Sequence, residues 1–196
     1  MKKPIFTDFG ERLILNFVNT VQSFRGKTID LIDSPSAVIG WLGYMEQRGQ
    51  ISSMQYERLL EDNSWDLPLL GEFRRRVREF VEDSSPTNIL HFAAYLAETM
   101  SHSPLTFTVV ANPKTLHWDL VPLPQCGGAL GLLSVLSYNG MQMITTDALK
   151  RVKKCDNPTC LAYFVNNSGK RKWCSMETCG NRRKSFRHYQ RYHPRN

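Results

Sequence analysis

Four cysteines lie near the end of the chain in two pairs of equal spacing. Cys155 and Cys160 are followed, after a spacer of thirteen residues, by Cys174 and Cys179. Thiolate sulfur is a preferred ligand of zinc, which takes four ligands in a tetrahedron. Two ligand pairs, each on a tight turn, bring four sulfurs together at little cost in chain entropy. The spacing therefore predicts that these four residues hold one structural Zn²⁺ ion.

Other chemistries use the same thiols. Four cysteines can form two disulfides or hold an iron–sulfur cluster, and a close thiol pair can be redox-active. The start of the chain is interrupted by Asp8, Glu11 and Arg12, which is unlike a signal peptide, and the sequence has no apolar run long enough to span a bilayer. We therefore expect a cytoplasmic protein with no membrane partner and with reduced cysteines. That compartment favours zinc over disulfides, and the usual C-x2-C runs of iron–sulfur proteins are missing.

The residues around the cysteines predict a small treble-clef-like zinc finger. The spacer fits a hairpin that turns at residues 166–169, "NNSG". Ser175 is a good helix cap, so Cys174 would precede a helix and Cys179 would lie in its first turn, where the helix dipole favours thiolates. Three aromatic side chains are expected to pack around the metal: Tyr163, Phe164 and Trp173. Because so small a unit has little core, the metal would supply on the order of 10 kcal/mol of its folding free energy.

Positive charge is concentrated in the same part of the chain. Residues 151–196 contain twelve Lys and Arg against two acidic residues, a net charge of +10, whereas residues 1–150 contain thirteen against sixteen, a net charge of −3. A zinc ion with four thiolates carries −2, so the basic end would keep a charge of about +8. On a helical wheel of residues 176–193, most of the cations lie opposite Cys179. This arrangement predicts contacts with nucleic-acid phosphates, most simply those of DNA, through Lys170, Arg171, Lys172, Arg183, Lys184, Arg187 and Arg191.

The contrast in charge divides the chain into two modules, a body over residues 1–150 and a zinc finger over residues 151–196. We expect an α+β protein whose body is mostly helical with a small antiparallel sheet. Hydrophobic periodicity and caps predict helices over residues 11–24, 33–49, 52–62, 67–83, 85–102 and 127–141, and a hairpin over residues 105–123. The basic run at residues 74–78 is interpreted as a solvated helix face. Three tryptophans are expected in the core or at its rim: Trp41, Trp65 and Trp118.

The body offers no pattern of catalytic residues, so we do not expect an enzyme. It has no Gly-rich phosphate loop, no G-x-S-x-G and no H-E-x-x-H. Asn16, Asn19 and Arg25 lie along or just beyond the first helix and could line a ligand pocket, although asparagines also cap or bridge loops. Cys126 is interpreted as a small buried residue, with a reactive sensor thiol as the alternative.

The stretch "CSMETCGNRRK" resembles the CGNR zinc-finger family of bacterial proteins, which is named for the residues found here as Cys179, Gly180, Asn181 and Arg182. The resemblance extends over about residues 150–192. It implies that the four cysteines are the zinc ligands, that Gly180 allows a close approach to the hairpin, and that Asn181 and Arg182 hydrogen-bond around the thiolates. Family members carry an N-terminal α/β module called the ABATE domain, whose opening resembles "LILNFVNT".

The resemblance also implies a role in transcription regulation under stress. Together with the charge distribution, it leads us to expect a bacterial DNA-binding regulator whose body senses a small molecule or a protein. A homodimer would raise the affinity of so small a reader. The alternative is a zinc-stabilised module that binds a protein or RNA without reading DNA sequence.

Overall fold

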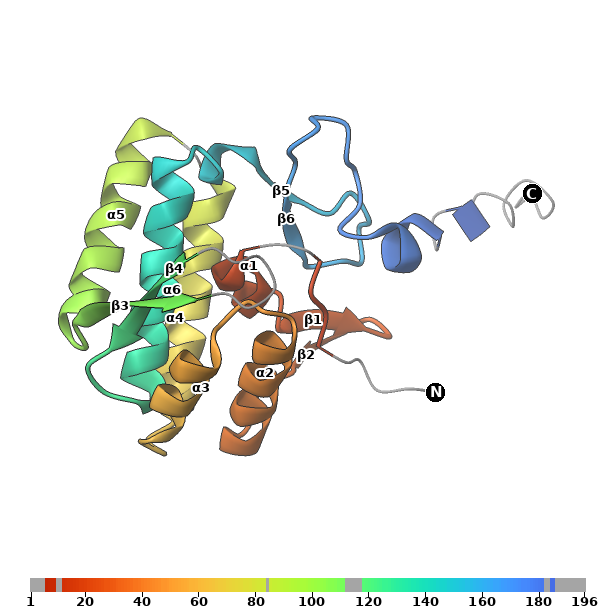
Figure 1. Cartoon of the computed structure of the whole chain (residues 1–196). Coiled ribbons are helices and arrows are strands. Elements are labelled where there is room, and N and C mark those ends of the chain that lie inside the picture. The colour runs from red at the N-terminus through yellow and green to blue at the C-terminus, as the bar shows by residue number, and fades with distance from the viewer. Residues whose placement is uncertain (1–5, 10–11, 84, 112–117, 182–183, 186–196) are drawn as a thin grey trace, which may run out of the picture.

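The structure is a computed structural model that describes residues 6–9, 12–83, 85–111, 118–181 and 184–185. Helices form most of the body, and the strands form small antiparallel sheets, which confirms the α+β class (Figure 1). The helices are α1 (Leu13–Val18), α2 (Pro35–Gln47), α3 (Ser53–Leu60), α4 (Leu67–Glu82), α5 (Pro86–Ser101) and α6 (Gly128–Thr145). Among the described residues, no helix is both long enough and apolar enough to cross a membrane.

Each sheet is a two-stranded hairpin. β1 (Val21–Phe24) pairs with β2 (Lys27–Asp30), β3 (Leu105–Ala111) with β4 (Trp118–Pro124), and β5 (Val152–Lys154) with β6 (Tyr163–Val165). The β3–β4 hairpin confirms the pairing predicted over residues 105–123. The body's core lies where α1 packs against α4 and α6, with α5 beside α6 and α3 next to β4 (Figure 1).

Local signals place the starts of the middle helices as expected. The hydroxyl of Ser34 accepts a hydrogen bond from the Ala37 amide at the start of α2. At α3, Ser52 and Gln55 form a reciprocal capping box, which satisfies amides that the first helical turn leaves unpaired.

The helix predicted over residues 11–24 is wrong beyond Val18. The chain turns at Asn19, and residues 21–24 become β1 instead. The turn to β2 uses Arg25 and Gly26 with φ values of +52° and +78°, the left-handed pair that a two-residue hairpin loop needs. The helical spacing of Val21 and Phe24 is a coincidence, because two strand residues three positions apart point to opposite faces.

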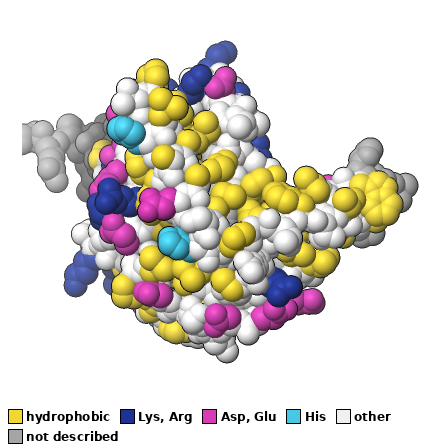
Figure 2. Space-filling view, turned by 90° about the vertical axis from the view of Figure 1, so that its left-hand side faces the viewer, with side chains coloured by type: hydrophobic (Ala, Val, Ile, Leu, Met, Phe, Trp, Pro, Cys, Tyr) yellow, Lys and Arg dark blue, Asp and Glu magenta, His cyan; other side chains and the backbone are white. Residues whose placement is uncertain are grey.

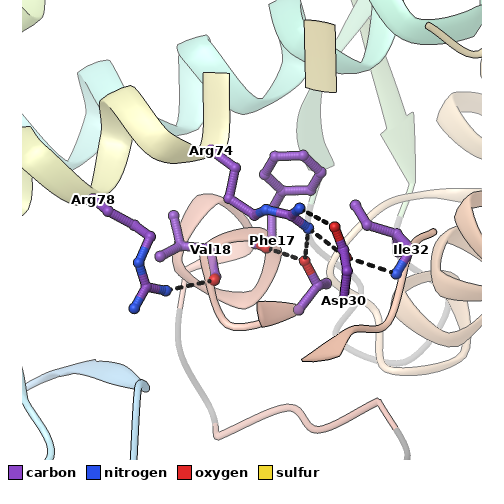
Figure 3. Close-up of polar contacts among 7 residues, drawn as sticks. Phe17, Val18, Asp30, Ile32, Arg74 and Arg78 are labelled. Carbon is purple, nitrogen blue, oxygen red and sulfur yellow. Dashed lines mark hydrogen bonds and ion pairs between the residues drawn. The ribbon is translucent and has the colours of Figure 1, made fainter. Parts of the chain in front are cut away.

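The predicted solvated face at residues 74–78 is half wrong. Arg75 and Arg76 are exposed beside acidic residues of the same helix, as expected. Arg74 is buried and Arg78 is partly buried, because their spacing of four residues turns both toward α1. Figure 3 shows both guanidinium groups reaching out from α4: Arg74 pairs with Asp30 at the end of β2, and Arg78 donates to the Val18 carbonyl at the end of α1.

The three tryptophans divide. Trp41 and Trp65 are buried, as predicted, and the ring of Trp41 packs edge-on against Phe17 at 5.5 Å between centroids. Trp118 is 71% exposed, so its expected place in the core or at its rim is wrong. It lies on β4, at a position whose face no other described element covers fully.

Strand β6 connects the body to the cysteine-rich end. Tyr163 and Val165 belong to the body's core, whereas Phe164, on the opposite face of the strand, packs with the cysteines. The body's core continues beyond residue 150, into β6. The division into modules at this residue stays a prediction.

Candidate metal centre

The four cysteine sulfurs form one compact cluster. The Sγ atoms of Cys155, Cys160, Cys174 and Cys179 all lie within 4.8 Å of one another, and those of Cys160 and Cys174 are 3.8 Å apart. A tetrahedron with Zn–S bonds of about 2.3 Å has S–S edges of about 3.8 Å. A disulfide would need about 2.05 Å, and all of these cysteines are free thiols. The cluster therefore fits one structural zinc ion, as the spacing predicted.

The first pair of sulfurs lies on the loop that joins β5 to β6. The Cys155 amide donates to the Ala162 carbonyl at 2.9 Å, and the Cys160 amide donates to the Asn157 carbonyl at 2.8 Å. These bonds close a tight turn and hold both sulfurs on one side of it. We call residues 155–181 the metal module.

The second pair lies at the start of a helical turn, η2 (Met176–Gly180). Ser175 caps it as predicted, and its hydroxyl accepts from the amides of Glu177 and Thr178. Cys174 precedes the turn, while Cys179 lies within it and its amide donates to the Ser175 carbonyl at 3.1 Å. The turn of the β5–β6 hairpin and the start of a helix thus supply two sulfurs each, as in a small zinc finger.

Two N–H groups point at sulfurs of the cluster. The side-chain amide of Asn157 donates to Cys179 Sγ, and the backbone amide of Cys174 donates to Cys155 Sγ, each at 3.4 Å. Such donors stabilise thiolates and orient them toward a metal. Asn157 was not predicted from the sequence, although its position two residues after a ligand was a usable signal. The family resemblance implied this role for Asn181, which is exposed, and for Arg182, which lies outside the described residues.

The expected close approach at Gly180 involves the residues around it. A β-carbon there would lie 2.6 Å from the Met176 sulfur and 3.5 Å from the Trp173 ring. Met176 is exposed and its flexible side chain can move away, and 3.5 Å is an ordinary van der Waals contact, so the space around position 180 does not require a glycine.

Because the four sulfurs lie so close together, the pKa values of the four thiols shift in opposite directions. Hydrogen bonding with Cys160 and Cys174 lowers the pKa of Cys155 to about 7. Contact with Cys155 lowers the pKa of Cys179 and raises those of Cys160 and Cys174, because a thiolate is stabilised by neighbouring S–H groups. Four thiolates so close together require a cation, and a divalent ion would supply that charge.

The spacer between the two cysteine pairs does not form the predicted hairpin, because its strand pairs with a strand outside the spacer. The chain does turn at residues 166–169, where the side chain of Asn166 bonds to both backbone groups of Arg171. However, β6 pairs with β5, upstream of the cysteines. Phe164 and Trp173 pack around the cluster as expected, whereas Tyr163 faces the body.

The basic residues predicted to contact phosphates have different settings. Lys170, Lys172 and Lys184 are exposed. Arg171 lies 4.4 Å above the Phe164 ring and donates to the carbonyls of Trp173 and Cys174, so its guanidinium stabilises the module itself. The other three fall outside the described residues: Arg183, Arg187 and Arg191.

The three residues proposed to line a ligand pocket do not come together in one site. Asn16 is buried and donates to Asp8, and Arg25 lies over the Phe24 ring at the exposed hairpin turn. Asn19 exchanges two hydrogen bonds with the backbone of Tyr163, at 2.8 and 2.9 Å, as a neighbouring strand would.

The contact between Asn19 and Tyr163 joins the body to the metal module, and two side chains of α4 add to this junction. Arg78 donates to the Leu161 carbonyl at 2.8 Å and lies 4.8 Å above the Tyr163 ring. Glu82 accepts from the Tyr163 hydroxyl; burial first, and then this hydrogen bond, raises the pKa of Tyr163 to about 12. The sequence carries no local signal for either residue, because their partners are about eighty residues away.

One comparison with known proteins bears on this site. A search of curated proteins finds no match to the chain. Residues 151–192, which contain all four clustered cysteines, match the CGNR zinc finger family.

Proposed function

We propose that this chain is a DNA-binding transcription regulator whose zinc finger contacts phosphates through the basic end of the chain. The observation that carries the proposal is the concentration of charge. The net +10 of residues 151–196 lies within and directly on either side of the metal module, next to a body of net −3. A single-signed cluster of cations is stabilised when it neutralises a row of phosphates and releases their counterions.

The surface next to the metal centre supports this proposal. An open hollow of about 700 Å³ lies there, and Lys170, Lys172 and Ser175 are among the residues that line it. Asp8 also lines the hollow and would disfavour an anion beside it. Phosphates would therefore meet the two exposed lysines, Lys170 and Lys172, and not the part of the hollow next to Asp8.

In this proposal the body senses a small molecule or a protein in a reducing cytoplasm. The likeness of residues 13–20 to an ABATE domain supports that role. An open cleft of the body, about 870 Å³, lies between the β1–β2 hairpin and the start of α2, and Phe24, Asp30 and Ser34 help to line it. We therefore move the proposed effector site from Asn16, Asn19 and Arg25 to this cleft.

The test is fluorescence anisotropy of labelled duplex DNA over a series of salt concentrations. Replacing Arg183, Arg187 and Arg191 by alanine should weaken binding and reduce the log–log salt slope by about 0.9 for each phosphate that is no longer neutralised. The matched control replaces Arg75 and Arg76, exposed on α4 and paired with acidic residues, and should leave the slope unchanged. Unchanged DNA affinity in the triple variant, with zinc content intact, would refute the proposed surface. Tighter binding of an RNA or an acidic protein than of DNA would favour the interaction-module alternative.

A further inference from the structure

The β3–β4 hairpin carries a hydrophobic face that the described part of the chain leaves exposed, and we call this hairpin the apolar arm. Phe107, Val109, Trp118 and Leu120 are 49%, 57%, 71% and 60% exposed. The register pairs Val109 with Leu120 and Ala111 with Trp118, so the period of two along each strand places these side chains on one face. In Figure 2 a continuous hydrophobic area runs out along this projecting arm.

The apolar arm is fixed to the body by contacts at its opposite face and at its base. Val121 is buried from the opposite face, and Gln55 of α3 donates to the Pro122 carbonyl at 2.9 Å. At the base of the apolar face, the Phe107 ring packs edge-on against Tyr138 of α6. These contacts hold the arm in place and leave its outer part uncovered by the described part of the chain.

The free edge of β3 adds a second reason to expect a partner. Among the described residues, β3 pairs with β4 alone. The Gln125 amide donates to the Pro104 carbonyl, and the alternation of an antiparallel ladder then points the backbone groups of Phe107 and Val109 away from β4. Exposed edges are normally protected by charges or proline, and residues 105–111 contain neither.

The size and neutrality of the face fit a second copy of this chain. With these exposed fractions, the four side chains present roughly 450 Å² of apolar surface. A standard interface buries about 800 Å² per partner, of which about 60% is non-polar, or about 480 Å². Asp119 is the one charged residue on the two strands, and alternation places it on the opposite face. An uncharged face is self-complementary, as a two-fold symmetric contact requires.

We propose that the chain forms a homodimer through the apolar arm, with Val109 and Leu120 at the centre of the contact and Trp118 as its main anchor. The arms of two copies lie against each other across a two-fold axis, which buries both apolar faces. This inference does not depend on nucleic-acid binding.

Sedimentation equilibrium of the full, zinc-loaded chain over a range of protein concentrations tests the proposal. The wild-type chain should be a dimer at micromolar concentration. The double variant Val109→Lys/Leu120→Lys should be monomeric, and Trp118→Ala should weaken the dimer by about 30-fold or more, the size of a hot-spot truncation. Because these side chains are exposed, helical content and zinc content should stay at wild-type values.

The matched control is Leu90→Lys, since Leu90 is 70% exposed but lies on α5, away from the arm. It should dimerise as the wild type does. A wild-type chain that stays monomeric at its highest soluble concentration overturns the proposal. So does a dimer that the folded Val109→Lys/Leu120→Lys variant leaves intact, because its interface would then lie elsewhere.

Discussion

The body and the metal module are stabilised by different interactions. The body buries a large set of apolar side chains from all its helices around α1 and α6. The metal module buries five residues in its own cluster, and three of them are cysteines. With so few apolar groups the module cannot offset the entropy of ordering its loops, whereas one zinc–thiolate centre can. Metal removal should therefore unfold one region and leave most of the other folded.

Strand β6 belongs to both regions. Tyr163 and Phe164 are adjacent in sequence but face different cores. Body and module are thus coupled through one short strand, its backbone bonds to Asn19, and the guanidinium of Arg78.

The largest effect is expected from Cys174→Ser. Removing one of four sulfurs should reduce the zinc content from one ion per chain toward zero and cost the module on the order of 10 kcal/mol of metal-dependent folding free energy. Metal analysis and hydrogen exchange would show that protection disappears in residues 155–179 and persists in α6. Cys126→Ser is the control, because Cys126 lies outside the cluster, and it should retain one zinc. Full zinc binding by Cys174→Ser would contradict the account.

The converse experiment is Phe73→Ala in the body. Phe73 is buried against Phe17 and Tyr95, so its truncation should destabilise the body by about 3–5 kcal/mol in urea unfolding. Zinc content should stay at one per folded chain. Leu90→Ala, at an exposed site, should change stability by less than about 0.5 kcal/mol. Loss of zinc while the body is still folded would show that the two regions are not stabilised separately.

A change at the junction should affect both regions. Asn19→Ala leaves the buried N–H and C=O of Tyr163 without their partner and should cost about 1–3 kcal/mol. It should also speed zinc extraction by a chelator, because β6 leads out of the first metal-binding turn. Asn167→Ala, in the exposed loop, is the control and should do neither. If Asn19→Ala leaves the rate of zinc extraction unchanged, contact with the body does not stabilise the metal module.

The smallest effect is expected at Glu82. The Tyr163 hydroxyl, and then Lys154, hold the pKa of this carboxyl below its usual value of 4.5. A lowered pKa means that the folded state prefers the carboxylate, so this contribution is present above pH 4.5 and is lost as the pH falls below it. The stability difference between wild type and Glu82→Gln should therefore shrink on acidification, in urea titrations at fixed pH values. Glu57→Gln, at a site on α3 away from the junction, should show no such trend.

Much of the fold and of the metal centre was predictable because its signals are local. Caps such as Ser34, Ser52 and Ser175 act within three residues, and cysteine spacing limits which sulfurs can meet. The same holds for the hairpin strands of residues 105–111 and 118–124, whose β-branched and aromatic residues favour extended backbone.

The remaining features depend on contacts between distant segments. The local sequence of Val21–Phe24 predicts a helix, but its pairing with β2 through the left-handed turn makes it a strand. Arg74 and Arg78 look solvated in a run of charges, and only the position of α1 gives them buried partners. Trp118 looks like a core residue because composition cannot distinguish a buried face from an exposed one.

Four sulfurs that hold one zinc ion, and a metal module of residues 155–181 that this ion stabilises, can be tested by X-ray absorption at the zinc edge of the full chain. We expect one zinc per chain with four sulfur neighbours at about 2.3 Å and no nitrogen or oxygen bound directly to the metal. A coordination sphere that contains nitrogen or oxygen ligands, or a reduced protein that binds no zinc, would contradict it.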